Sequence, residues 1–196
     1  CMAANMAYRA GLDKVVVVNR SFAQILTGQA QGFDIALSQI TITDERKKVV
    51  DFTDSYYAGG LVVMVKADNK AINKLADLDG KKVSVQVGTK SVAYLTEKFP
   101  KVQRVEVEKN QEMFNLVDIG RADAAVTGKP AAFQYVRTRP GLRVLDEQLT
   151  TEEYGMALRK DTPELTKAVN GAITKLKADG TYAAIVKKWF SNGAAK

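Results

Sequence analysis

The sequence predicts an α/β protein of two lobes, each built on a mostly parallel sheet flanked by helices. Short apolar strands alternate with helical segments along the chain, which is typical of this architecture. One strand–helix–strand unit occurs twice, which indicates two lobes. Two extended stretches, 57–66 and 148–160, predict a two-stranded hinge between the lobes. The predicted lobes are residues 1–60 with 150–196, and residues 61–149.

The first copy of the unit centres on Val15–Val18, four consecutive β-branched residues that predict a buried strand. A helix is predicted next at 21–29, and a second buried strand at 33–37. The second copy repeats this order, with a strand predicted at 104–107, a helix at 110–119 and a strand at 122–126. Further helices are predicted from Pro163 and from Thr181.

The two copies differ at their beginning. The second copy opens with a predicted strand, 82–87, which leads into a helix at 90–98, whereas the first has only the helix Met2–Arg9. We therefore expect the first lobe to lack its N-terminal strand here, either because the sequence is cut inside a domain or because a preceding segment is not included in it. Because a parallel sheet without a central strand exposes backbone groups and apolar surface, we expect this chain to be unstable on its own or to borrow a strand.

The composition disfavours several classes of function. The chain has 196 residues, one cysteine and no histidine, so neither an internal disulfide nor a histidine-based catalytic or zinc site is expected. We predict no catalytic residue, no metal and no cofactor. The net charge of +7 comes mostly from dispersed basic pairs among acids, which predicts a solvated surface rather than a nucleic-acid partner. No apolar run approaches the about 20 residues of a membrane span, and no secretory signal opens the sequence.

A first candidate site follows the predicted strand 33–37. It contains Ser38, Thr41, Thr43 and Arg46. Thr43 is a suitable N-cap, which places Arg46 in the first turn of a helix. Hydroxyl groups, backbone N–H groups and a guanidinium together suit a carboxylate. A plain helix cap with an exposed arginine fits the same pattern, which does not decide between the two.

A second candidate site lies where a strand passes into a helix. It contains Gln86, Gly88 and Thr89, and the unpaired N–H groups of the helix start attract anions. An ordinary capped helix is the alternative, and the segment lacks the glycines of a phosphate-binding loop. If the two sites face each other from separate lobes, they grip one small anion from both sides.

Motifs along essentially the whole chain resemble one known family in its order. They are the segments 33–46, 50–57, 75–83, 87–89, 120–124, 153–160, 179–182 and 188–190. The sequence is similar to the polar amino-acid-binding subfamily of the extracytoplasmic solute-binding proteins that serve ABC importers. The resemblance implies the type II periplasmic-binding-protein fold, which ionotropic glutamate receptors share in their ligand-binding domains.

The resemblance also implies roles for single residues. Arg46 would pair with the ligand α-carboxylate, while Thr41 and the Ser38 backbone would contact the carboxylate or the ammonium. Thr89 would supply a hydroxyl and an N–H group. Phe22 would be the aromatic residue near the ligand, although the segment after it is about one residue shorter than in the family.

One position departs from the family pattern. Where relatives carry an aspartate that receives the ligand ammonium, this chain has Gly128 followed by Lys129. Loss of such a bond costs about 1.5–3 kcal/mol, or about ten- to a hundredfold in affinity. Either another acid replaces the aspartate, or the ligand has no α-ammonium. In the second case Lys90 and Lys129 would favour an acidic ligand such as a dicarboxylate. The sequence around Lys129 is also typical of a solvated surface lysine.

The resemblance predicts an extracytoplasmic or periplasmic receptor that binds an amino acid or a related carboxylate and delivers it to an ABC transporter permease. Two alternatives stay open. One is an enzyme similar to cyclohexadienyl dehydratase on the same scaffold. The other is the ligand-binding sensor domain of a signalling receptor.

Overall fold

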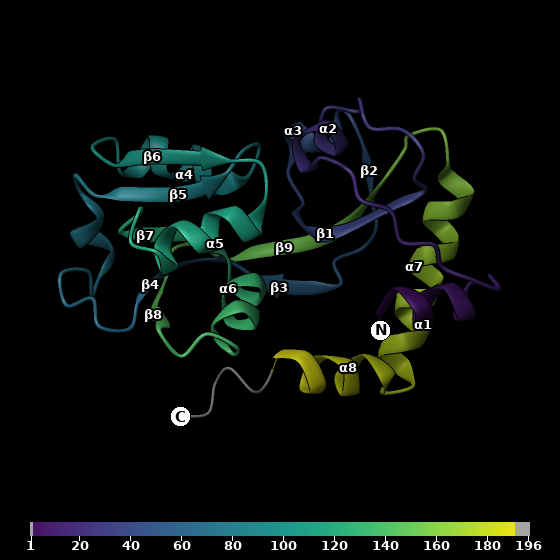
Figure 1. The fold of residues 1–196 in the computed structure, drawn as a ribbon. Helices are drawn as coiled ribbons and strands as arrows, with labels where there is room; N and C mark the ends of the chain where they lie inside the picture. Colours follow the sequence, from purple (N-terminus) through teal and green to yellow (C-terminus); the bar gives the residue numbers. More distant parts are fainter. Residues whose placement is uncertain (1, 191–196) are drawn as a thin grey trace. The chain divides into compact units, whose positions relative to one another are not determined.

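A computed structural model describes residues 2–190, which fall into two compact units (Figure 1). Unit 1 contains residues 1–58 and 153–196, and unit 2 contains residues 59–152. The chain thus leaves unit 1 once, forms the whole of unit 2 and returns.

Unit 1 contains a four-stranded sheet in which β9 (Glu152–Leu158) is flanked by β1 (Ile35–Thr41) and β2 (Asp51–Phe52), and β3 (Tyr57–Gly59) also pairs with β9. Both β1 and β2 run antiparallel to β9. The helices of the unit are α1 (Met2–Arg9), α2 (Phe22–Leu26), α3 (Asp44–Lys47), α7 (Pro163–Ala178) and α8 (Thr181–Phe190).

Alternate residues of β9 enter two different cores. Tyr154 and Met156 belong to a cluster with residues of α1, α7 and α8, while Ala157 joins a cluster with Ile25 of α2 and Ile40 of β1. Successive strand residues point to opposite faces, so α1, α7 and α8 pack on one face of the sheet and α2 on the other. Both faces are therefore apolar.

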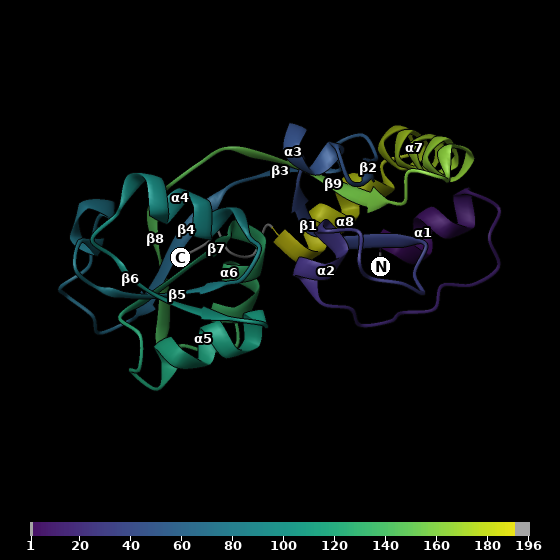
Figure 2. The same ribbon diagram turned by 90° about the horizontal axis from the view of Figure 1, so that it is seen from above.

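Unit 2 contains a five-stranded sheet in the order β6-β5-β7-β4-β8. Its elements are β4 (Leu61–Lys66), the 3-10 helix η1 (Leu75–Leu78), β5 (Lys82–Gln86), α4 (Lys90–Lys98), β6 (Gln103–Val107), α5 (Asn110–Asp118), β7 (Ala124–Gly128), α6 (Lys129–Val136) and β8 (Leu142–Gln148). Figure 2 shows α4 and α5 on opposite sides of β5 and β6. Leu95 of α4 and Met113 of α5 accordingly belong to separate apolar clusters.

The predicted α/β class with two sheets flanked by helices is confirmed, but the strand pairing is not mostly parallel. β5 runs parallel to β6 and β7, but β4 runs antiparallel to β7 and β8, and the registered pairs of unit 1 are antiparallel. Parallel neighbours need a crossover between them, usually a helix. Among the described strands, β5, β6, β7 and β8 are linked in succession by the helices α4, α5 and α6. β4, which enters unit 2, follows β3 without a helix and has no such constraint.

The predicted buried strand Val15–Val18 is also absent. These residues form no regular structure, and their side chains are 43%, 69%, 87% and 42% exposed in sequence order. Four β-branched apolar residues favour a strand, but a strand forms only where a neighbour offers backbone hydrogen bonds. Among residues 2–190, no backbone hydrogen bond joins this segment to such a neighbour.

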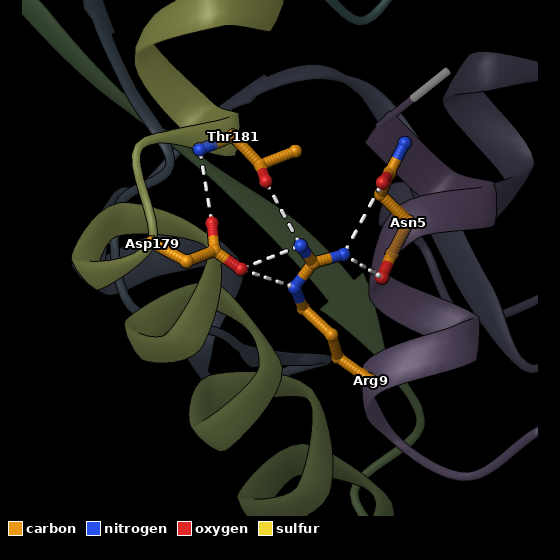
Figure 3. A network of polar contacts seen from close by, with 4 residues as sticks. All are labelled: Asn5, Arg9, Asp179 and Thr181. Atoms are coloured by element: carbon orange, nitrogen blue, oxygen red, sulfur yellow. Dashed lines mark hydrogen bonds and ion pairs between the residues drawn. The ribbon is translucent and has the colours of Figure 1, made fainter.

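A polar network joins α1 to the turn between α7 and α8 (Figure 3). The Arg9 guanidinium donates to Asp179 Oδ2 from Nε at 3.0 Å and from Nη2 at 2.5 Å, and to Thr181 Oγ1 at 2.9 Å. Its Nη1 donates to the carbonyl and side-chain oxygens of Asn5, both at 3.2 Å. Hydrogen bonds from Thr181 and then Arg9 lower the pKa of Asp179 from 3.8 to about 2.

The lowered pKa of Asp179 predicts an acid-sensitive contribution to stability. The folded pKa lies below the unfolded one, so the contribution is present above pH ~4 and is lost as the pH falls toward ~2. We expect the free energy of unfolding of the wild type to fall over this interval more steeply than that of Asp179→Asn. Urea titrations at several pH values check this, and equal slopes for the two proteins would contradict it.

Candidate ligand-binding site

The end of β1 carries a local irregularity. Its pairing with β9 shifts register between Ala36 and Ile40, and Gln39 has a φ of 51°, in the left-handed region. The Gln39 backbone is hydrogen-bonded to the buried Tyr56 side chain, whose pKa is raised above its usual range by burial. Ser38 is exposed within the irregular stretch, and Thr41 after it is buried. The irregularity thus has a partner in the core of unit 1.

Thr43 and Arg46 form a capped helix start, as the sequence predicts. Thr43 is the N-cap of α3, and its side-chain oxygen accepts a hydrogen bond from the Arg46 backbone N–H at 3.2 Å. The Arg46 side chain turns back toward β1, where its Nη1 donates to the Thr41 carbonyl at 2.9 Å. The guanidinium is therefore held at a fixed place beside the end of β1.

Phe22 of α2 completes this arrangement. The Arg46 Cζ atom lies 5.9 Å from the centre of the Phe22 ring, and both side chains are half-buried. A ring face attracts a guanidinium and limits its motion. The structure thus brings together Phe22, Thr41, Thr43 and Arg46, all of which the sequence singled out.

In unit 2, Gln86, Gly88 and Thr89 form the turn between β5 and α4. Gly88 has a φ of 71°, a conformation that glycine adopts without strain. The turn directs both donors of Thr89 to the Gln86 carbonyl, the hydroxyl at 2.7 Å and the backbone N–H at 3.4 Å. Both Thr89 donors suggested for a ligand are thus engaged within the turn. The donors that the segment offers instead are the first backbone N–H groups of α4, because the first N–H groups of a helix have no acceptor within the helix.

Lys129 and Lys90 are joined by a chain of polar contacts. Lys129 Nζ donates to Gln148 Oε1 at 3.2 Å, and Gln148 Nε2 donates to the Thr150 carbonyl at 2.6 Å. Thr150 Oγ1 donates to Glu152 Oε1 at 2.8 Å, and Lys90 Nζ lies 3.6 Å from that same oxygen. This series of contacts joins the first residue of α6 to the first residue of α4. Lys129 is the first residue of α6, because it follows the N-cap Gly128.

The two lysines of this chain differ in their partners. The Glu152 side chain is 1% exposed and opposes the charge of Lys90. Lys129 instead contacts a neutral amide and lies 5.9 Å from the centre of the Phe133 ring. Lys129 is therefore the stronger candidate of the two to favour an acidic ligand.

Sequence reasoning missed Gln148, Thr150 and Glu152. These residues are spaced two apart, so in an extended segment their side chains lie on one face. Three polar groups on one face of an otherwise strand-like stretch were the available signal. Their partners, Lys90 and Lys129, are distant in sequence and could be found only from the fold.

Comparison with known proteins identifies the chain. Residues 2–192 match the bacterial extracellular solute-binding proteins, family 3. The chain belongs to this family. Its sequence is 33% identical over 196 residues to the L-cystine-binding protein TcyJ of Escherichia coli (strain K12), covering 99% of this chain and 74% of that protein.

Solved structures of amino-acid-binding proteins agree with this membership. An ancestral arginine-binding protein bound to glutamine superimposes with a TM-score of 0.86 and 36% identity, over 96% of this chain and 85% of that one. An ancestral amino acid-binding protein described as a precursor of cyclohexadienyl dehydratase gives a TM-score of 0.84 and 38% identity, over 97% and 83%. The fold is the type II periplasmic-binding-protein fold.

Two negative observations concern the described part of this family 3 protein. Within residues 2–190, no group of three or more His, Cys, Asp or Glu side chains is placed to hold a metal ion. No helix in that range is long and apolar enough to cross a membrane.

Gly60 lies directly against two members of the polar chain of unit 2. A Cβ atom there would lie 1.8 Å from the Thr150 carbonyl oxygen and 2.4 Å from Gln148 Nε2. The Gly60 carbonyl also accepts a hydrogen bond from the Lys129 N–H at 2.8 Å. A side chain at this position therefore pushes directly on backbone atoms.

Gly60→Ala is expected to lower the free energy of unfolding by about 1–3 kcal/mol, because the backbone at Thr150 must move. Urea denaturation followed by circular dichroism measures the loss. Gly141→Ala is the matched control in the same unit, since nothing lies within 4 Å of a Cβ atom there. Equal stabilities for the two variants would show that the close approach at Gly60 is relieved at no cost.

Proposed function

We propose that this family 3 protein binds a small amino acid or amino-acid-like carboxylate and delivers it to an ABC importer. The proposal rests on the Arg46 guanidinium, which is held between the Thr41 carbonyl and the Phe22 ring. A guanidinium presents two parallel N–H donors that match the two oxygens of a carboxylate. Because its position is fixed before binding, less conformational entropy is lost when a ligand arrives.

The ligand class is supported by the relatives. Proteins named for binding L-cystine, arginine, glutamine and histidine all align with this chain at 30–34% identity. These amino acids share the α-carboxylate and differ in their side chains. An arginine that holds the shared carboxylate is therefore compatible with any of these amino acids. Other residues of the protein determine which ligand side chain is recognised.

We further propose that unit 2 contributes to binding of the same ligand. The N–H groups at the start of α4, next to Thr89, attract a carboxylate through the helix dipole. Lys129, whose contacts are to neutral groups, adds a positive charge. A ligand that binds both units shifts the equilibrium toward the conformation in which both sets of groups reach it.

Glu152 is the acid of unit 2 that could replace the family aspartate missing at Gly128. Its carboxylate belongs to the same polar chain as Lys129. The side chain is 1% exposed and is engaged by Thr150 and Lys90. It therefore receives a ligand ammonium only if Lys90 gives up its contact. We propose that the ammonium is bound weakly or not at all in this protein.

The family also supports a location and a partner. Family 3 consists of bacterial extracellular solute-binding proteins, and relatives are named as parts of ABC transporters. We propose that this protein acts outside the cytoplasmic membrane and is recognised there by an ABC transporter permease.

The dehydratase alternative predicts an enzymatic product instead of simple binding. It is prompted by the structural relative described as a precursor of cyclohexadienyl dehydratase. The buried acid found in unit 2, Glu152, is engaged by Lys90 and Thr150 and so is not poised to protonate a leaving hydroxyl. Incubation with prephenate or arogenate, with detection of an aromatic product by absorbance, separates an enzyme from a receptor.

Arg46→Ala is expected to weaken binding of amino acids at least tenfold, because a charge-assisted bond to the carboxylate is lost. Isothermal titration of L-cystine, L-arginine, L-glutamine and L-glutamate against both proteins measures the change. Lys47→Ala is the control, since Lys47 is the neighbouring cation and its recorded ion pair is with exposed Asp44 at 3.4 Å. Affinity of Arg46→Ala within about threefold of the wild type would refute the carboxylate contact.

Gly128→Asp tests whether the ligand ammonium lies near this position. Gly128 is an N-cap with φ −61° and ψ 136°, where aspartate is favourable. We expect the variant to tighten L-glutamate binding relative to glutarate, which lacks the α-ammonium, by about ten- to a hundredfold. Gly141→Asp adds the same charge elsewhere in unit 2 as a control. An unchanged ratio in Gly128→Asp would place the ammonium away from residue 128.

A further inference from the structure

Two lysines of unit 2 occupy equivalent places in the fold. Lys90 is the first residue of α4, and Lys129 is the first residue of α6. The strands that lead into these helices, β5 and β7, are parallel neighbours in the sheet. The carboxyl ends of parallel neighbours lie at the same edge of a sheet, so both helices begin at this edge. Each lysine therefore adds its charge to a helix end that is already positive.

The partners of the two lysines differ in charge. Lys90 Nζ lies 3.6 Å from Glu152 Oε1, and the Glu152 side chain is 1% exposed. Lys129 Nζ donates to the neutral Gln148 Oε1 at 3.2 Å, and within residues 2–190 it forms no ion pair. The charge at the start of α4 is thus offset by a buried carboxylate, whereas the charge at the start of α6 meets a neutral group.

The Gln148 amide is held in one orientation. Its Nε2 donates to the Thr150 carbonyl at 2.6 Å and to the Gly59 carbonyl at 3.3 Å. Rotation of the amide by 180° would bring its oxygen against these two carbonyls and its NH₂ group against the Lys129 ammonium. The fold therefore fixes Oε1 as the acceptor that Lys129 meets, and residue 148 offers that lysine a dipole and no opposing charge.

The two acceptors lie on one short stretch of chain. Gln148 is the last residue of β8, and Glu152 is the first residue of β9. This stretch leads the chain out of unit 2, which ends at residue 152. It belongs to neither α4 nor α6. A substitution here therefore alters the charge balance at both lysines and leaves the sequence of both helices unchanged.

We propose that residues 148 and 152 set the charge preference of the ligand site. The inference rests on the proposed function, in which Arg46 binds the α-carboxylate and unit 2 binds the same ligand. Gln148 leaves the Lys129 charge without an opposing carboxylate, so the site prefers L-glutamate, which has a second carboxylate, to its neutral amide L-glutamine. Glu152 limits this preference because it offsets the charge of Lys90. Both residues act through a lysine and are positioning residues.

An exchange of charge at the two residues tests the proposal in opposite directions. Isothermal titration of the 196-residue protein with L-glutamate and with L-glutamine gives the ratio of the two affinities. The wild type is expected to bind L-glutamate more tightly. Gln148→Glu is expected to lower the ratio about tenfold, because a carboxylate then opposes Lys129. Glu152→Gln is expected to raise the ratio about tenfold, because the charge of Lys90 is no longer offset.

Two control variants separate charge from structure. Glu153→Gln removes the same charge one residue away, at an exposed side chain that accepts a hydrogen bond from Ser55 Oγ. Gln148→Met loses the same amide contacts as Gln148→Glu but adds no charge. Both controls are expected to keep the ratio within about threefold of the wild type.

The outcomes distinguish this inference from the proposed function. A wild-type ratio at or below one, or ratios that do not move in opposite directions in Gln148→Glu and Glu152→Gln, would overturn the inference. Binding of another amino acid with neither L-glutamate nor L-glutamine bound would also overturn it. Arg46→Ala is expected to weaken both ligands alike and to leave the ratio unchanged. Unweakened binding by Arg46→Ala would contradict the proposed function itself.

Discussion

The hydrogen bond from the Arg46 guanidinium to the Thr41 carbonyl is the contact on which the functional interpretation depends. The backbone of α3 is set by the Thr43 cap, and the side chain is confined by the Phe22 ring, so three segments of unit 1 determine where one cation lies. A cation fixed by its own protein before the ligand arrives is what a carboxylate receptor needs. An arginine on a mobile surface loop would carry the same charge without the same selectivity.

Unit 2 adds a second constraint through the polar chain from Lys129 to Lys90. Gly60 is placed where the Thr150 carbonyl approaches too closely for any side chain, and hydrogen bonds in the same region connect Gln148, Thr150 and Glu152. The buried Glu152 opposes the charge of Lys90, whereas Lys129 faces neutral groups. The two lysines look alike in the sequence, but within residues 2–190 only the charge of Lys90 is opposed by a neighbouring carboxylate.

Local patterns predicted much of this structure, and they failed where long-range pairing decides. The helix starts at Lys90 and Pro163 and the Thr43 cap follow from spacing and capping residues, and they are confirmed. Val15–Val18 satisfies the local conditions for a strand but has no pairing strand in the part of the chain that the structure describes, and it lies exposed. The expectation of mostly parallel sheets failed at β1 and β4, which pair antiparallel with β9 and β7 from distant parts of the chain. The contact of Phe22 with Arg46 agrees with the grouping expected from the family resemblance, while Glu152 required the fold.

The most direct test of the account is the ¹⁵N–¹H resonance of Arg46 Nε, assigned through Arg46→Lys and followed during titration with an amino acid that binds. The account predicts that this resonance moves in proportion to ligand occupancy and that its solvent exchange slows, because the guanidinium gains a carboxylate partner. Saturation of binding with the Arg46 Nε resonance unmoved, while resonances elsewhere shift, would show that the ligand is held by other groups and would contradict the account.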